Sequence, residues 1–247
     1  MSSFVDGLKW LVDGRHYGTD ADAGFLEIDI PTRIIEHVQI SSQALLLAAA
    51  MALPVGLYIG HTRRFEFLAI SLGNLGRALP SFGVLGLVFP FTTTWPGEIG
   101  FWATFVALTL LAIPPILTNS YVAVKNVDAD TVEAARGMGL TDVHILQKLE
   151  IPLGIPLIVA GFRIAAVQVV ATATLGALAG WGGLGRFIVD GKSQGDTPQL
   201  VGGALLVALL AIATELAFAG LQRVLTPKES SSPSKVFRPA DLEGTLV

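Results

Sequence analysis

Long stretches without charge constrain this chain more than any other feature. Residues 38–60 and 99–124 contain no Asp, Glu, Lys or Arg. A helix needs about 20 apolar residues to cross the roughly 30 Å hydrocarbon core of a bilayer. Only 15% of the chain is charged, whereas a soluble domain carries about 25%. The chain is therefore predicted to be an integral membrane protein.

Three further stretches have the same character, each with a single charge inside it. They are residues 67–91 with Arg77, residues 155–180 with Arg163, and residues 200–222 with Glu215. The predicted fold class is all-α, a polytopic membrane helix bundle of about five transmembrane helices. Residues 1–37 are expected to form an extracellular N-terminal tail, 38–225 the transmembrane domain and 226–247 a flexible cytoplasmic tail.

The basic residues between the predicted spans indicate the orientation. Cytoplasmic loops of membrane proteins are enriched in Lys and Arg. The side of the membrane that holds residues 128–152 carries more of them: Arg63, Arg64, Lys125, Arg136, Lys148, Arg223, Lys228, Lys235 and Arg238. This predicts an external N-terminus and a cytoplasmic C-terminus. Residues 4–12 are amphipathic, which fits either a helix on the membrane surface or a disordered tail.

Residues 128–152 form one short polar segment between two apolar stretches. Asp130 is expected to cap a first helix, with Glu133 three residues later completing a capping box. Gly137 and Gly139 are expected to supply a turn. A polar projection of this kind on a membrane bundle offers a cytoplasmic protein a surface to bind.

A second short helix is expected after the turn. Thr141 is placed to cap it, and Pro152 is expected to stop it before the apolar sequence resumes. The whole segment is thus predicted to be a helix-turn-helix.

The spacing in this segment resembles the EAA loop of ABC importer permeases, which is written E-A-A-x3-G-x9-I-x-L-P. The residues that match it are Glu133, Ala134, Ala135, Gly139, Leu149, Ile151 and Pro152. We call residues 128–152 the coupling segment, because the resemblance implies that it docks in a groove of an ATPase. Closure of the ATPase pair on ATP would then push two such segments together and open the pore outward.

A wider resemblance narrows the branch of the family. Residues 111–191 look like permeases for glycine betaine, carnitine and choline, the osmoprotectant branch, and Asn74 with Pro80 and Ser81 fits the same pattern. The similar stretches are residues 113–119, 134–139, 150–153, 165–170, 172–175 and 182–185. A permease for methionine or another amino acid shares the EAA loop and remains the alternative.

The resemblance implies a type I ABC importer permease in the bacterial inner membrane. Its expected partners are a second permease subunit (a copy or a sister chain), two ABC ATPase subunits and an extracellular or periplasmic substrate-binding protein. The chain has no P-loop and is not expected to be an enzyme or to bind a cofactor, since ATP and Mg would be held by the ATPase. Its dispersed histidines, absent cysteines and scattered basic residues indicate neither a metal site nor a nucleic-acid surface.

Charges inside the spans need an explanation, because they are costly in hydrocarbon. Arg163 and Glu215 each lie about seven or eight residues from the inner end of their spans, which puts them roughly 10–12 Å deep. They are expected to form an ion pair, with snorkelling to the inner surface as the alternative. Arg77 lies nearer the midplane and is expected to be structural or to act in gating.

Small polar side chains in the spans are the candidates for a translocation pathway, because a pathway should hold its cargo weakly. They are Ser81, Asn119, Gln168, Thr172 and Thr174. The alternative role for the same residues is hydrogen bonding between helices. The pairs Gly56 with Gly60 and Gly176 with Gly180 have the spacing of close helix packing.

Overall fold

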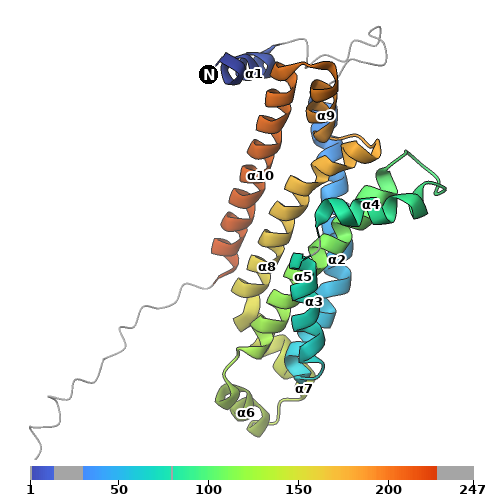
Figure 1. Ribbon diagram of the computed structural model, residues 1–247. Coiled ribbons are helices and arrows are strands. Elements are labelled where there is room, and N and C mark those ends of the chain that lie inside the picture. The colour runs from blue at the N-terminus through green and yellow to red at the C-terminus, as the bar shows by residue number, and fades with distance from the viewer. Residues whose placement is uncertain (1, 14–29, 79, 227–247) are drawn as a thin grey trace, which may run out of the picture.

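The computed structural model describes residues 2–13, 30–78 and 80–226, and all of their regular structure is helical. The predicted tail, residues 226–247, lies outside the described part apart from its first residue. The elements in chain order are α1 (Ser2–Val12), α2 (Ile30–Thr62), α3 (Glu66–Ala78), α4 (Ser81–Thr92), α5 (Phe101–Lys125), α6 (Ala129–Gly137), α7 (Asp142–Ile145), the π turn η2 (Leu146–Glu150), α8 (Ile151–Thr172), the 3-10 turn η3 (Ala173–Ala179), α9 (Gly185–Gln194) and α10 (Thr197–Leu225). Figure 1 shows an elongated bundle with α1 and α9 at one end and α6 at the other.

Within the described residues, four helical segments are long and apolar enough to cross a membrane. They are Ile30–Thr62, Phe101–Lys125, Asp142–Ala179 and Thr197–Leu225. They correspond to four of the five predicted spans, and the all-α membrane bundle is confirmed.

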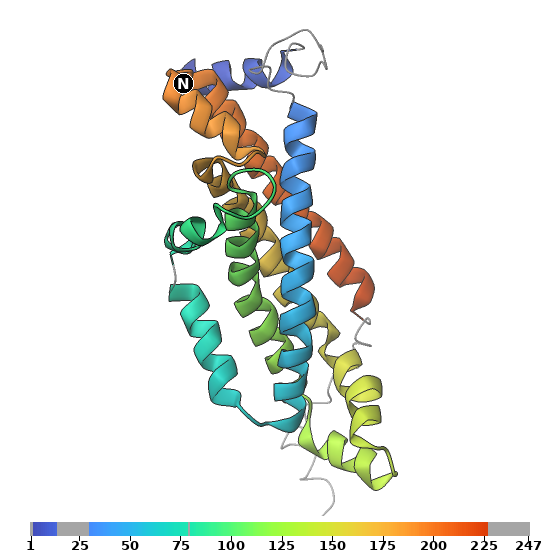
Figure 2. The same cartoon turned by 90° about the vertical axis from the view of Figure 1, so that its right-hand side faces the viewer.

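The second predicted span, residues 67–91, is not one helix. It is divided into α3 and α4, and α4 turns away from the bundle axis (Figures 1 and 2). Pro80 precedes the first residue of α4 and has an extended backbone. Proline lacks an N–H and disfavours the α conformation in the residue before it, so the helix stops there. The 13 residues of α3 rise only about 20 Å, which is less than the roughly 30 Å hydrocarbon core. Arg77 lies in the last turn of α3, and its side chain is outside the described part.

The first spanning helix begins at Ile30, ahead of the predicted start at residue 38. Its extra turns contain Arg33, Glu36 and His37, so they lie outside the uncharged stretch from which the span was predicted. Their side chains are nevertheless satisfied: Glu36 Oε2 accepts a 2.7 Å hydrogen bond from the Gly183 N–H. His37, which is fully buried, lies with Nε2 2.8 Å from the Val170 carbonyl oxygen.

Helices α2 and α5 pack closely at two glycines. A Cβ at Gly56 would lie 2.7 Å from the Leu117 carbonyl oxygen, and one at Gly60 would lie 2.7 Å from the Tyr121 carbonyl oxygen. Backbone atoms cannot move aside as flexible side chains do, so these positions require glycine. The spacing of this pair therefore serves packing inside the subunit, as small residues do in membrane bundles.

Replacing Gly56 by alanine is expected to lower the free energy of unfolding by about 1–3 kcal/mol, because the added methyl group forces α2 away from α5. Unfolding in mixed micelles with increasing SDS, followed by tryptophan fluorescence, measures this change. Gly86→Ala in α4 is the matched control, since no atom lies within 4 Å of a Cβ there. Equal stabilities of the two variants would contradict close packing at Gly56.

The amphipathic N-terminal stretch is a helix rather than a disordered tail. In Figure 1, α1 lies across the end of α10. The Trp10 ring covers Gly202 and meets the Phe187 ring edge-on, with the ring centroids 5.3 Å apart. Phe4 and Val12 keep exposed apolar side chains.

Candidate functional site

The first helix of the coupling segment, α6, begins at Ala129 and has Asp128 at its N-cap position. The predicted cap at Asp130 is wrong, because that residue already lies in the first turn. The Asp128 carboxylate accepts a 3.0 Å hydrogen bond from the Thr131 hydroxyl instead of capping a backbone N–H. Glu133 is displaced from the capping-box position and presents its side chain to solvent.

Gly139 makes the turn that ends α6, with a φ of 87°. Its N–H donates to the Arg136 carbonyl oxygen, and the Leu140 N–H donates to the Ala135 carbonyl oxygen. A left-handed glycine with such bonds is the usual way to end a helix. Gly137, the other predicted turn residue, is the last residue of α6 itself.

The second half of the segment does not stop at Pro152. Thr141 occupies the N-cap position of α7, although its hydroxyl contacts His144 rather than a backbone N–H. The helix then continues through a π turn, in which the Ile151 N–H bonds to the Leu146 carbonyl oxygen. Pro152 is the second residue of α8 and directly follows the π turn, and the helix passes through it without ending. The coupling segment is therefore continuous with a spanning helix.

The segment presents apolar side chains at the end of the bundle. Figure 2 shows α6 projecting beyond the spanning helices. Met138 is 76% exposed and Val143 61% exposed. The Arg136 guanidinium lies 2.9 Å from the Asp142 carboxylate and links the two short helices.

Two of the predicted pathway residues line one cavity. Asn119 of α5 and Gln168 of α8 lie on a cavity of about 140 Å³ between α3, α5 and α8. The remaining lining residues are mostly apolar or small: Gly73, Gly76, Leu111, Pro114, Pro115, Thr118 and Ile164.

A residue that the sequence did not single out also lines this cavity. The Thr118 hydroxyl is buried and makes no hydrogen bond within the described part of the chain. A buried hydroxyl without a partner is unfavourable unless a ligand or water completes it. In the sequence, the place of Thr118 directly before the pathway candidate Asn119 could have indicated this role.

The other pathway candidates lie elsewhere. Ser81 and Thr172 line a small pocket of about 10 Å³, which shares Leu111 with the larger cavity. Thr174 lines neither of these cavities, and its hydroxyl donates to the Ala171 carbonyl oxygen of its own turn. The structure thus brings four of the five candidates together as two neighbouring pairs.

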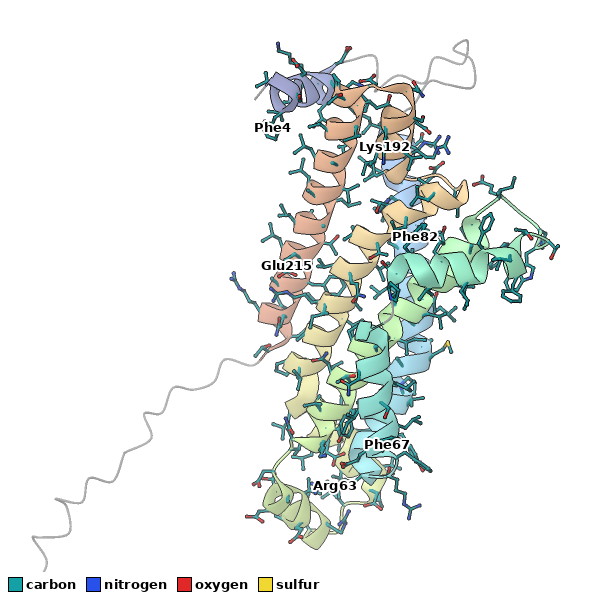
Figure 3. All side chains as sticks on the ribbon, viewed as in Figure 1. Phe4, Arg63, Phe67, Phe82, Lys192 and Glu215 are labelled. Carbon is teal, nitrogen blue, oxygen red and sulfur yellow. The ribbon has the colours of Figure 1, made fainter. Side chains whose placement is uncertain are left out.

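Arg163 of α8 and Glu215 of α10 form an ion pair. Arg163 Nε donates to Glu215 Oε1 at 2.7 Å, and Arg163 Nη2 contacts the same oxygen. Gln222 extends the contact, because its Oε1 accepts from Arg163 Nη1 at 3.3 Å and its Nε2 donates to the Pro156 carbonyl oxygen at 3.1 Å. Figure 3 shows Glu215 on α10, the helix that runs beside α8.

Comparison with known proteins identifies the class of this bundle. Residues 52–231 match the family of binding-protein-dependent transport system inner membrane components. The chain belongs to this family. It is therefore the multi-pass inner-membrane permease of an ABC importer, and ATP hydrolysis belongs to another subunit of the transporter.

Several relatives of this permease have known cargoes. It is 35% identical over 193 residues to the carnitine transport permease protein OpuCB of Listeria monocytogenes, covering 78% of this chain and 86% of that protein. It is 31% identical over 217 residues to the osmoprotectant import permease protein OsmW of Salmonella typhimurium, covering 88% and 99% of the two chains.

The fold of the permease matches that of a solved transporter. A chain of the MetNI methionine ABC transporter in an inward-facing conformation superposes with a TM-score of 0.71, at 24% sequence identity, covering 80% of this chain and 96% of that chain. This likeness establishes the architecture of an ABC importer permease. Such a permease works in a complex with ATPase and binding-protein partners.

Proposed function

We propose that this permease forms the translocation pathway for quaternary-amine osmoprotectants, such as glycine betaine, carnitine, choline and proline betaine. The observation that carries the proposal is the cavity beside Asn119 and Gln168. Its α5 and α8 walls fall within residues 111–191, the stretch that resembles osmoprotectant permeases. The similarity to a carnitine permease and to an osmoprotectant import permease supports the same class of cargo.

The chemistry of the cavity suits such a cargo. A quaternary ammonium has no N–H to donate, so it needs no acceptor. The carboxylate of glycine betaine, carnitine or proline betaine, and the hydroxyl of choline, accept hydrogen bonds. The Thr118 hydroxyl and the Gln168 amide offer donors to these acceptors. The Asn119 amide nitrogen donates one N–H to the Pro115 carbonyl oxygen and keeps a second one. No charged side chain lines the cavity within the described residues, which favours weak, reversible contact.

The coupling segment is proposed to dock on an ABC ATPase, with one ATPase under each of two permease subunits. ATP and Mg are bound by that partner, and cargo is delivered by a binding protein at the opposite end. The described start of the chain and α6 lie at opposite ends of the bundle (Figure 1). This supports an external N-terminus and a cytoplasmic coupling segment, as does the distribution of basic residues.

Uptake into proteoliposomes tests the cargo. The permease is reconstituted with its cognate ATPase and binding protein, and uptake of radiolabelled glycine betaine, carnitine and choline is compared with that of methionine and other amino acids. Saturable, ATP-dependent uptake of a quaternary amine is the expected result. Uptake of methionine alone would overturn the proposal and favour the amino-acid alternative. Flux through the permease without the ATPase would instead indicate a channel.

Replacing Gln168 by leucine is expected to slow uptake of the quaternary amine about tenfold, because the cavity loses one of its hydrogen-bond donors. Binding of the cargo to the isolated binding protein does not change, since the substitution lies in the membrane. Thr174→Val is the matched control, because that hydroxyl bonds only to its own helical turn. Equal uptake by the two variants would exclude Gln168 from the pathway.

A further inference from the structure

A buried polar pair joins the coupling segment to the first spanning helix. Glu150 lies in the π turn η2 and is 5% exposed. Its Oε2 atom lies 2.5 Å from Nδ1 of His61, which is in the last turn of α2. The resemblance to the EAA loop does not include either residue, since Glu150 occupies a variable position of that pattern.

His61 lies at the end of a closely packed pair of helices, α2 and α5. The glycine contacts at Gly56 and Gly60 hold these helices together over the two turns before His61. The same end of α5 is fixed to α3, because Lys125 Nζ lies 2.6 Å from Glu66 Oε2 and 2.7 Å from the Tyr121 hydroxyl. A displacement of His61 is therefore shared by three helices.

The connection between α2 and α3 is itself constrained. Arg63 and Phe65 have φ values of 54° and 63°, left-handed conformations that side chains with a Cβ rarely adopt. Arg63 and Phe67 lie at the α7 end of the bundle in Figure 3. Because this turn is short and strained, it cannot absorb a shift of α2 without passing it to α3. Helix α3 carries Gly73 and Gly76, which line the cavity.

We propose that His61 and Glu150 are positioning residues that transmit movement of the coupling segment to α2 and α3. The contact is nearly buried, and a buried carboxylate that loses its partner is strongly destabilised. The pair therefore stays together as the segment moves, and the α3 wall of the cavity moves with it. This inference rests on the proposed docking of the segment on an ATPase.

The number of ATP molecules hydrolysed per cargo molecule imported tests the inference. It is measured in proteoliposomes that contain the complete transporter with its binding protein. His61→Leu is expected to raise this ratio about fivefold, whereas His61→Gln, whose amide can still donate to Glu150, stays near the wild-type ratio. A wild-type ratio for assembled His61→Leu would overturn the inference.

A double variant covers the case in which His61→Leu does not assemble. His61→Leu with Glu150→Leu removes the unpaired carboxylate, and replacing both members of a buried pair usually preserves folding. The inference expects this variant to assemble and to keep the raised ratio. A purely structural pair would give the wild-type ratio, which would contradict the inference.

Cross-linking tests whether a new bond between the two positions restores coupling, and it is feasible because the chain contains no cysteine of its own. His61→Cys with Glu150→Cys is expected to be uncoupled, and a short, reducible bis-thiol reagent that bridges the two cysteines is expected to return the ratio to the wild-type value. The two single-cysteine variants are the controls. Bridging that leaves the transporter uncoupled would count against a shared movement.

Failure of this inference can be told apart from failure of the proposed function. If Gly139→Val leaves uptake intact although it distorts the turn between α6 and α7, the geometry of the coupling segment does not matter for coupling and the proposed docking fails. If that distortion stops uptake while the His61 variants keep the wild-type ratio, only the transmitting role of the pair is excluded.

Discussion

Replacing Gly139 by valine will reduce ATP-dependent uptake to less than about one-tenth of the wild-type rate. The glycine has a φ of 87°, and the left-handed conformation costs a residue with a Cβ about 1–2 kcal/mol, with β-branched residues least suited to it. No atom lies within 4 Å of a Cβ at this position. The effect therefore comes from the backbone, which must rearrange and turn α6 away from α7.

Two measurements separate this effect from a general loss of folding. Binding of cargo to the binding protein is expected to remain unchanged, and the amount of permease in the membrane is expected to stay near that of the wild type. Gly137→Ala is the matched control, since Gly137 is helical and equally unobstructed. Normal uptake by Gly139→Val would show that the geometry of this turn does not matter for coupling.

The spans were predictable because the bilayer sets a minimum length for apolar helices. The break between α3 and α4 was not, although Pro80 was visible in the sequence. Proline also occurs inside α2, α4, α5 and α8 without ending them, as at Pro54 and Pro114. Neighbouring helices can satisfy the backbone groups that a proline frees. Which proline ends a helix therefore depends on packing, which no local pattern records.

The start of the first spanning helix was missed for a related reason. Glu36 and His37 are polar, so a search for apolar residues ends before them. Their hydrogen bonds reach Gly183 and Val170, which lie more than a hundred residues along the chain. Only the folded structure shows that these polar groups are satisfied.

The coupling segment was found from its spacing, but its local geometry was only partly correct. Asp128 and Asp130 are both suitable N-cap residues, and the sequence does not rank them. The turn at Gly139 was predictable because glycine tolerates a positive φ. That the helix continues through Pro152 was not predictable, because it depends on a π turn, a rare element for which no sequence pattern is known here.

Glu215→Leu is expected to remove most of the permease from the membrane. Arg163 would then lose the carboxylate to which it donates, and an unpaired charge in a span is strongly unfavourable. The buried residues of α10 are Gln199, Gly202 and Gly203, all near its start. The second half of α10 therefore has no buried residue, and its side-chain hydrogen bonds to α8 come from this pair and Gln222, so breaking the pair weakens its attachment.

The amount of folded permease in purified membranes, together with its thermal unfolding midpoint in detergent, measures this effect. Arg163→Leu combined with Glu215→Leu is expected to recover most of the loss, because apolar replacement of both partners leaves no charge in the bilayer. Asp190→Ala is the matched control, since its pair with Arg186 joins residues four apart within α9 and such pairs on one helix contribute little. If Glu215→Leu alone is as stable as the wild type, Arg163 reaches the membrane surface unaided and the contact with α10 does not hold the bundle together.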